Sequence, residues 1–357
     1  MLEGVQSNVA AARDHEAVRS VMTGYKLSQA LYVAAKLEIA DEVAAGTRNV
    51  DDLARATRTD TRSLHRLLRL LAAAGFFAED DGGEFSLTGV GRLLISDAPY
   101  SDWAWILKEG ELWWEAWSHL LECVQTGRPA FDLVHGKGLF EYLADVATSD
   151  VADRTVAALS SAGTDSQSHA ILEAYDFGAF DSVVDVGGGN AVLLLAALGQ
   201  HPDLRGVLFD LPYVVDVARS TGATDAFAAR CELIGGSFFE AVPPGRDLYV
   251  LRSILHDWDD DRALTILENC RRAVPPHGRL LVIEVVASEE DGDTSRDDGL
   301  AVALRDVNLM VMTSGRKRAV AELRDLLSGA GFGVRRVIAL ETRFRIIEAV
   351  PTKEAGP

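Results

Sequence analysis

Apolar residues in the first hundred positions recur with the spacing typical of helices. One helix is predicted from a run that stops at Gly46, and a later one stops at Gly75 after a turn and cap at Thr59 to Ser63. Two short strands are predicted around an Asp-Gly-Gly turn, at Phe76–Ala78 and Glu84–Leu87. The apolar faces of the two helices are formed by Leu27, Leu31, Ala34, Ala35 and Leu37 and by Leu64, Leu67, Leu68, Leu70 and Leu71.

The order helix, turn, helix, hairpin is the pattern of a winged helix, so residues 1–102 are predicted to form a helical, winged-helix-like domain. Its last helix carries His65, Arg66 and Arg69, and DNA binding therefore has to be considered. The alternative is that this module packs against a second copy of the chain, with the basic side chains in solvent.

Residues 103–175 are predicted to form a helical connector rich in aromatic residues. Five of the six tryptophans lie between positions 103 and 117. Aromatic side chains on helices usually pack in a core, but as a group they can also line a pocket for a flat aromatic ligand. The candidates for such an acceptor pocket are Trp103, Trp113, Trp117, Phe131 and, from further along the chain, Met310.

From Phe180 onward, strand and helix patterns alternate, which is typical of an α/β fold with a mostly parallel, Rossmann-like sheet. Residues 176–357 are predicted to form this domain, with helices at 190–200, 212–221, 260–274 and 319–330. The last two strands follow each other without room for a crossover helix, so they should pair antiparallel. The predicted strands are Ser182–Val186, Gly206–Asp210, Cys231–Gly235, Leu248–Arg252, Gly278–Val286, Gly333–Leu340 and Phe344–Val350.

Composition narrows the possible partners. The formal net charge is −19, with 54 acidic against 35 basic residues, and the basic residues are scattered, so nucleic acid is not expected as a partner. No apolar run approaches the length of a membrane span, and the N-terminus does not resemble a signal peptide. The protein is therefore expected to be cytoplasmic, without membrane association. The three cysteines form no C-x-x-C pair, which argues against a zinc site or a disulfide framework.

The glycine turn 185–189, "DVGGG", follows the first strand of the predicted sheet. In open α/β sheets the ligand binds at the carboxyl ends of the strands, and glycines let the backbone approach it closely. Asp210 ends the next strand, where an acid can accept hydrogen bonds from ribose hydroxyls. The turn and this acid indicate a nucleoside cofactor.

A dinucleotide, a phosphate and an adenosyl group are all candidates for that cofactor. The third glycine of a dinucleotide motif is replaced by Asn190 and Ala191, and the motif begins with Asp185, which would repel a diphosphate. A cationic amino-acid moiety would instead be attracted by this carboxylate. These features, together with the antiparallel last strand, favour S-adenosylmethionine.

His256 follows the fourth strand, at the carboxyl edge of the sheet beside the predicted cofactor site. Its ordinary pKa near neutrality makes histidine suitable for removing a phenol proton, and a phenolate is a better nucleophile than a phenol. A metal-assisted reaction is not favoured, because Asn308 is present but no second histidine lies nearby in the sequence.

Residues from about 20 to 350 resemble the S-adenosylmethionine-dependent small-molecule O-methyltransferases, a family that includes plant caffeate and flavonoid enzymes and bacterial polyketide-tailoring enzymes. The matching segments are "DVGGG" (185–189), "FDLP" (209–212), "GGSFF" (235–239), "LHDWDDDRALTIL" (255–267), "RLLVIE" (279–284) and "LLSGAGF" (326–332).

The resemblance implies a homodimer formed through the N-terminal domain, an aromatic small-molecule acceptor, and His256 as a general base flanked by Glu284. S-adenosylhomocysteine would be the product of the cofactor, and no metal is implied. The expected cofactor-binding residues, carried by these motifs, are Asp185, Gly187, Gly188, Gly189, Asp210, Leu211, Ser237, Phe238, Arg252 and Ser253.

Three positions depart from the family pattern. Ser237 replaces the usual aspartate of "GDFF", Ala191 replaces a glycine, and Lys317 replaces the second flanking acid in the "G-x-E-R" motif. A cation beside His256 is expected to lower the pKa of the imidazole, and Asp257 or Asp306 could substitute for the missing acid.

The reaction predicted from these features is methyl transfer from S-adenosylmethionine to the hydroxyl of a phenolic natural product, in secondary metabolism such as antibiotic biosynthesis. The alternative keeps the fold and cofactor but methylates carbon or nitrogen, or catalyses a non-methylating step such as decarboxylation, hydroxylation or rearrangement. A DNA-binding regulator is the third possibility, and the acidic composition argues against it.

Overall fold

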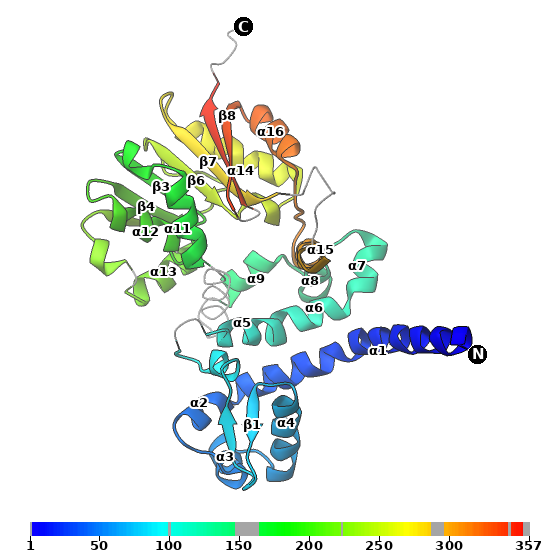
Figure 1. Cartoon of the computed structure of the whole chain (residues 1–357). Coiled ribbons are helices and arrows are strands. Elements are labelled where there is room, and N and C mark those ends of the chain that lie inside the picture. Colours follow the sequence, from blue (N-terminus) through cyan, green and yellow to red (C-terminus); the bar gives the residue numbers. More distant parts are fainter. Residues whose placement is uncertain are drawn as a thin grey trace. The chain divides into compact units, whose positions relative to one another are not determined.

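A computed structural model of the chain describes residues 2–98, 101–146, 164–222, 224–286, 296–341 and 344–352. The chain divides into two compact units, residues 1–114 and 115–357 (Figure 1). Among the described residues, no helix is both long enough and apolar enough to cross a membrane.

The first unit is mainly helical and contains a small β-hairpin. Strands β1 and β2 pair antiparallel, and their hairpin packs with the preceding helices around a core that includes Leu53, Leu68 and Phe77. The elements are α1 (Leu2–Lys36), α2 (Ile39–Ala44), α3 (Val50–Thr57), α4 (Thr61–Ala73), β1 (Phe77–Glu79), β2 (Phe85–Leu87), η1 (Gly91–Leu94), α5 (Trp103–Lys108) and the π-helix η2 (Glu109–Trp113).

Two predictions for this unit need correction. The helix expected to run on to Gly46 is interrupted after Lys36, where Glu38 takes a left-handed conformation with φ 52° and α2 starts at a new angle that buries Ile39. Leu70, expected on the apolar face of α4, is 46% exposed. The cap predicted at Thr59 to Ser63 is confirmed, because the Asp60 carboxylate accepts a hydrogen bond from the backbone N–H of Ser63 at 2.9 Å.

The second unit contains a seven-stranded sheet in the order β5-β4-β3-β6-β7-β9-β8. Strands β3 to β7 run parallel to one another, whereas β9 runs antiparallel to both β7 and β8. This confirms the predicted Rossmann-like sheet with an antiparallel last strand. The strands are β3 (Ser182–Val186), β4 (Arg205–Asp210), β5 (Cys231–Gly235), β6 (Leu248–Arg252), β7 (Arg279–Val285), β8 (Phe332–Ala339) and β9 (Phe344–Pro351).

Helices cover both faces of this sheet (Figure 1). One face buries its apolar side chains against α14 (Asp260–Ala273) and α16 (Val320–Gly329). The other face packs on α11 (Thr164–Ala174), α12 (Val192–Gln200) and α13 (Pro212–Ser220). Because helices close both faces, the strands carry continuous apolar runs, and polar residues gather where the strands end.

The second unit contains further helices. The long helix α15 (Arg296–Met312), which the sequence pattern did not predict, packs against α7 (Leu120–Thr126) and α8 (Ala130–His135). The other short elements are α6 (Trp114–Ser118), α9 (Leu139–Asp145), η3 (Phe177–Ala179), η4 (Asp225–Phe227) and η5 (Leu255–Asp257).

Candidate active site

The predicted glycine turn lies directly after β3. Gly187 and Gly189 have φ angles of 72° and 56°, which favour glycine. A Cβ atom on Gly187 would lie 2.5 Å from the side chain of Ile254, and one on Gly188 would lie 2.6 Å from the Asp185 carboxyl carbon. The turn thus needs glycine both for its conformation and for its close packing against Ile254, which follows β6 (Leu248–Arg252), and against Asp185.

Asp210 lies at the end of β4 and holds the same turn. Its carboxylate accepts hydrogen bonds from the backbone N–H of Gly189 at 2.8 Å and of Leu211 at 2.7 Å. Burial raises the pKa of Asp210 to about 6, although both hydrogen bonds oppose the shift. Burial also raises the pKa of Asp185 to about 7, with Arg252 opposing and Asp210 adding to the shift. Asp185 and Asp210 therefore lie near each other and are shielded from solvent.

Arg252, at the end of β6, is fixed by two residues that sequence reasoning missed. Its guanidinium donates to Ser168 Oγ and to Gln167 Oε1, both at 3.0 Å. Both partners lie on α11, which sequence analysis predicts only as part of the helical region 103–175. The next residue, Ser253, has a φ of 55°, a left-handed conformation that is uncommon outside glycine and often found at functional sites.

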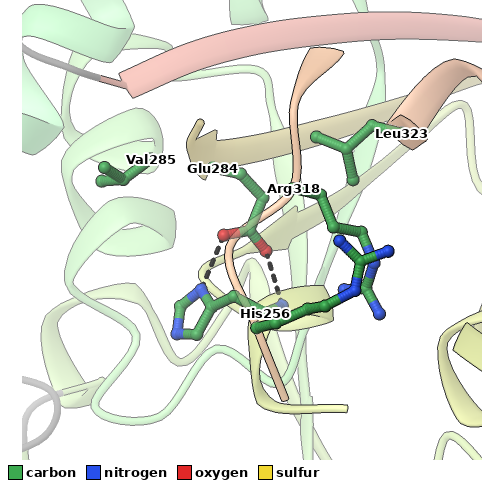
Figure 2. A pocket seen from close by; sticks show the side chains of 6 residues that line it. His256, Glu284, Val285, Arg318 and Leu323 are labelled. Atoms are coloured by element: carbon green, nitrogen blue, oxygen red, sulfur yellow. Dashed lines mark hydrogen bonds and ion pairs between the residues drawn. The ribbon is translucent and has the colours of Figure 1, made fainter. Parts of the chain in front are cut away.

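His256 lies in η5, which follows directly, and Glu284 at the end of β7 holds it (Figure 2). Glu284 Oε2 is 2.6 Å from His256 Nδ1. The other carboxylate oxygen accepts from the backbone N–H groups of Ile254 at 3.1 Å and Leu255 at 2.9 Å. Glu284 is only 3% exposed, so one buried carboxylate orients the ring and also secures its loop.

The charge around His256 differs from the expectation. Burial disfavours the imidazolium, but Glu284 and Asp257 more than compensate, and the pKa of His256 is raised to about 9. Lys317 does act in the expected direction, but it is the weakest contributor. The predicted effect of the lysine is therefore present, but the two carboxylates outweigh it and the net shift of the pKa is upward.

Asp257 provides the second acid beside the ring, with Oδ1 3.6 Å from His256 Nε2. Burial raises the pKa of Asp257 to about 6, with His256 opposing the shift. Asp306 has a different contact, because its carboxylate accepts from the backbone N–H of Lys317 at 3.1 Å. Of the two candidate substitutes, Asp257 is the one with a described contact to the histidine.

The loop that carries Lys317 packs directly on the histidine loop. A Cβ atom on Gly315 would lie 1.9 Å from the carbonyl oxygen of His256. Arg318 donates to the carbonyl oxygens of Leu255 at 2.6 Å and Trp258 at 2.7 Å. Arg318 is 3% exposed, and sequence reasoning did not assign it a role, although it ends the same "G-x-x-R" segment.

Ser237 and Phe238 follow β5 on the same edge of the sheet. Ser237 Oγ accepts from the backbone N–H of Phe239 at 3.2 Å, and the Phe238 carbonyl accepts from Asn269 Nδ2 at 2.7 Å. The ring of Phe238 would lie 3.6 Å from a Cβ atom on Gly187. This segment therefore meets the glycine turn.

The predicted acceptor-pocket residues fall in both units. In the second, Trp117 Nε1 donates to Asn308 Oδ1 at 3.0 Å, Phe131 is fully buried, and the carbonyl oxygen of Met310 accepts from Cys123 Sγ at 3.4 Å. Helix α15 contacts both α7 and α8, and these contacts bring the three residues near one another. In the first unit, Trp103 Nε1 donates to the carbonyl oxygen of Ala35 at 3.0 Å, and Trp113 is buried.

Comparison with known proteins identifies the family. Residues 117–333 match the O-methyltransferase domain, and residues 20–97 match the O-methyltransferase dimerisation domain. Phenazine O-methyltransferase PhzM of Lysobacter antibioticus is 38% identical over 331 residues, which cover 93% of this chain and 94% of that protein. The chain belongs to the S-adenosylmethionine-dependent O-methyltransferase family.

Further relatives illustrate the range of this O-methyltransferase family. The phenazine-1-carboxylate N-methyltransferase of Pseudomonas aeruginosa is 34% identical over 344 residues, covering 96% of this chain and 98% of that protein. An O-methyltransferase of neocarzinostatin biosynthesis, solved in complex with S-adenosylmethionine and 2-hydroxy-5-methyl naphthoic acid, superposes with a TM-score of 0.77 at 32% identity and covers 91% of this chain and 95% of its own.

Family membership confirms the predicted fold class and the predicted cofactor, S-adenosylmethionine. The dimerisation-domain match lies entirely within the first unit. Within the described part of the chain, no group of three or more histidine, cysteine or acidic side chains is arranged to hold a metal ion.

Proposed function

We propose that this O-methyltransferase methylates a hydroxyl group of an aromatic natural product, with His256 as the general base. The observation that carries the proposal is the His256–Glu284 contact of 2.6 Å, in a loop that packs on the glycine turn through Ile254. A base oriented by a buried carboxylate, next to a cofactor loop, is what proton removal during methyl transfer requires.

The residues present are suited to S-adenosylmethionine. The glycine turn has no side chains to obstruct a ligand, and Asp210 already accepts two backbone hydrogen bonds that fix its orientation. When bound, S-adenosylmethionine supplies an electrophilic methyl group on a positively charged sulfur. We propose that the cofactor contacts come from Asp185, Gly187, Gly188, Gly189, Asp210, Leu211, Ser237, Phe238, Arg252 and Ser253.

His256 would take the acceptor proton at Nε2, because Nδ1 faces Glu284. Glu284 then stabilises the imidazolium that forms, and Asp257 on the Nε2 side adds to this stabilisation. Asp306 would act indirectly, by fixing the backbone of Lys317. Positioning and proton removal together supply the rate enhancement.

We propose that the acceptor pocket is lined by Trp117, Phe131 and Met310 of the second unit. Two buried imidazole nitrogens support a polar ligand near this group. His135 Nε2 and His119 Nδ1 have no hydrogen-bond partner among the described residues, and the ring of His135 packs on Phe131 with centroids 4.2 Å apart. Such nitrogens normally find a partner.

The enzyme would act as a homodimer through its N-terminal domain. Helix α1 exposes apolar residues at helical spacing, namely Val18, Val21, Met22 and Tyr25, which are 54–84% exposed. A stripe of this kind on a soluble protein usually marks an interface. We propose a dimerisation domain at 1–102, an aromatic connector at 103–175 that contributes to the acceptor pocket, and a catalytic domain at 176–357.

A related reaction, methylation of nitrogen, is the second candidate. Lys317 occupies the position where the family pattern has an acid, and it opposes the raised pKa of His256. An amine acceptor needs less help from a base than a phenol does, and one relative is named as an N-methyltransferase.

Calorimetric titration with S-adenosylmethionine, S-adenosylhomocysteine and NAD tests the cofactor site, and a screen of phenolic and aromatic amine acceptors tests the reaction. We expect both adenosyl ligands to bind and NAD not to bind. His256→Ala should lower phenol methylation about 10²- to 10⁴-fold while cofactor binding is kept. Full activity of His256→Ala would refute the base assignment, and methylation of amines alone would favour the second candidate.

A further inference from the structure

A second cavity lies at the amino ends of β4 and β5, where the described part of the second unit holds several arginines. Its volume is about 340 Å³, at the lower end of the range of small-molecule sites. Strand β4 runs from Arg205 at this cavity to Asp210 at the cofactor edge of the sheet. At the rise of an extended strand these two ends are about 17 Å apart. The cavity is therefore distinct from the candidate active site.

The lining of this cavity is positively charged. Its described charged residues are three arginines, Arg205, Arg230 and Arg246, and one acid, Glu232. Three positive charges and one negative charge leave a formal charge of +2, whereas the whole chain carries −19. Guanidinium groups that lie together repel one another, and an anion between them removes this repulsion.

Arg230 is fixed in position by the backbone. Its guanidinium donates to the carbonyl oxygens of Leu198 at 2.8 Å, His201 at 2.9 Å and Leu204 at 2.8 Å. These carbonyls lie in the last turn of α12 and in the segment that follows it. No carboxylate within the described ranges pairs with Arg230. Its positive charge is therefore held at the cavity without being neutralised by an acid.

The other two arginines have donors to spare. Arg246 Nη2 donates to Glu232 Oε2 at 3.2 Å, but its Nε is buried and lacks a hydrogen-bond partner among the described residues. Such buried donors normally find an acceptor. The Glu232 side chain is 57% exposed, so it can turn into solvent and leave both nitrogens to another anion. Arg205 is exposed, and its side chain makes no hydrogen bond or ion pair with any other described residue.

We propose that this cavity binds a phosphate group of a small molecule. A phosphate monoester carries nearly two negative charges at neutral pH and three oxygens that accept hydrogen bonds, which matches the formal charge of the lining. Arg246 would bind two of these oxygens through Nε and Nη2, since guanidinium and phosphate pair in this bidentate manner. Arg205 would bind the third oxygen, and Arg230 supplies a fixed positive charge.

The organic part of such a ligand would rest on an apolar surface. Ala228 and Ala229 line the cavity and are exposed, so an apolar group attached to the phosphate could cover them. Free phosphate would leave them in solvent. The proposal does not depend on the methyl-transfer reaction, because the cavity lies at the edge of the sheet opposite to His256.

The test titrates inorganic phosphate and phenyl phosphate calorimetrically into the full-length protein, at pH 7 and constant ionic strength. Saturation with S-adenosylhomocysteine keeps both probes out of the cofactor site. Arg205→Gln and Arg246→Gln should each weaken binding about tenfold. Glu232→Gln should strengthen it several-fold, because the acid no longer competes for Arg246. The matched control Arg324→Gln changes an exposed arginine on α16 outside the cavity and should leave the affinity unchanged.

The two probes separate the possible sources of the phosphate. Tighter binding of phenyl phosphate would assign the site to an organic phosphate, and equal binding would assign it to free phosphate. Both results support the site if Arg205→Gln weakens them. Absence of binding by both probes would overturn the inference, and so would equal losses in Arg205→Gln and Arg324→Gln. If the arginine variants do not fold, Glu232→Gln decides, and an unchanged affinity in that variant would contradict the proposal.

Discussion

Glu284 holds His256 by its ring and by its loop at the same time. One carboxylate oxygen lies 2.6 Å from His256 Nδ1, and the other accepts from the backbone N–H groups of Ile254 and Leu255. The orientation of the imidazole and the conformation of the loop therefore depend on a single buried side chain. This coupling determines how the site should respond to pH and to substitution.

The wild-type enzyme should be most active in alkaline solution. A general base must be neutral to accept a proton, and the pKa of His256 is raised to about 9 by Glu284 and Asp257 against the effect of burial. We expect kcat, measured with saturating cofactor and acceptor, to rise about tenfold per pH unit from pH 7 towards 9 and then level off. A profile that is already flat at pH 7 would contradict this assignment.

Glu284→Gln should move that profile to lower pH. The carboxylate is the largest contribution that raises the pKa of His256. Its removal should therefore shift the rise of kcat to a pH lower by about one unit or more. The plateau rate should fall about 100-fold, because the ring loses the carboxylate that stabilises the imidazolium. The cofactor affinity serves as the control and should change little. An unchanged midpoint would mean that Glu284 has no electrostatic role.

Lys317→Met should shift the profile in the opposite direction. Lys317 lowers the pKa of His256, so its removal should raise that pKa by about a few tenths of a unit and slow the reaction at pH 7. Lys317→Glu, which restores the acid of the family pattern, should raise the pKa of His256 further. Lys137→Met removes a lysine that pairs with Asp145 and is the matched control. A faster reaction at pH 7 in Lys317→Met would refute the prediction.

Glu348→Gln should destabilise the sheet in a pH-dependent manner. Glu348 on β9 is fully buried and binds Arg335 and Arg336 on β8, and its Oε1 lies 3.3 Å from Arg279 on β7. Burial raises the pKa of Glu348, but the arginines more than offset this and lower it below 4.5. The stabilisation is present above pH 4.5 and is lost as the pH falls through the lowered value.

At pH 7 the free energy of unfolding should fall by about 2 kcal/mol, a value below that of a fully buried pair because two of the arginines are half exposed. Denaturant titrations of wild type and Glu348→Gln at pH 7 and pH 3 measure this difference. It should be large at pH 7 and small at pH 3. Equal differences at both pH values would show that packing, not charge, holds the three strands.

Much of the catalytic unit could be predicted from its sequence. Each of its strands is an apolar run bounded by turn residues, and the predicted ends agree with β3 to β9 to within about one residue. The glycine turn and Asp210 are both predicted at the carboxyl edge of the sheet, in one cofactor site, and the structure shows Asp210 bound to Gly189.

Other features depend on tertiary contacts that a local pattern does not contain. The apolar spacing continues through Leu37, so nothing in it indicates the left-handed Glu38. The sequence indicated Glu284, Asp257 and Lys317 as neighbours of His256, but the net pKa of the imidazole depends on how near each of these charges lies and how deeply the ring is buried. Gln167 and Ser168 reach Arg252 from a helix more than eighty residues earlier.

The position of β9 also has a consequence for how the chain is made. Strand β8 pairs only with β9 within the described sheet, and β9 lies between it and β7. During synthesis, β7 and β8 therefore emerge from the ribosome without the strand that joins them. The sheet that carries Glu284 becomes complete only after residues Phe344–Pro351 have been synthesised. Nascent chains that stall or terminate just before Phe344 would expose two unpaired strand edges and would be prone to aggregate.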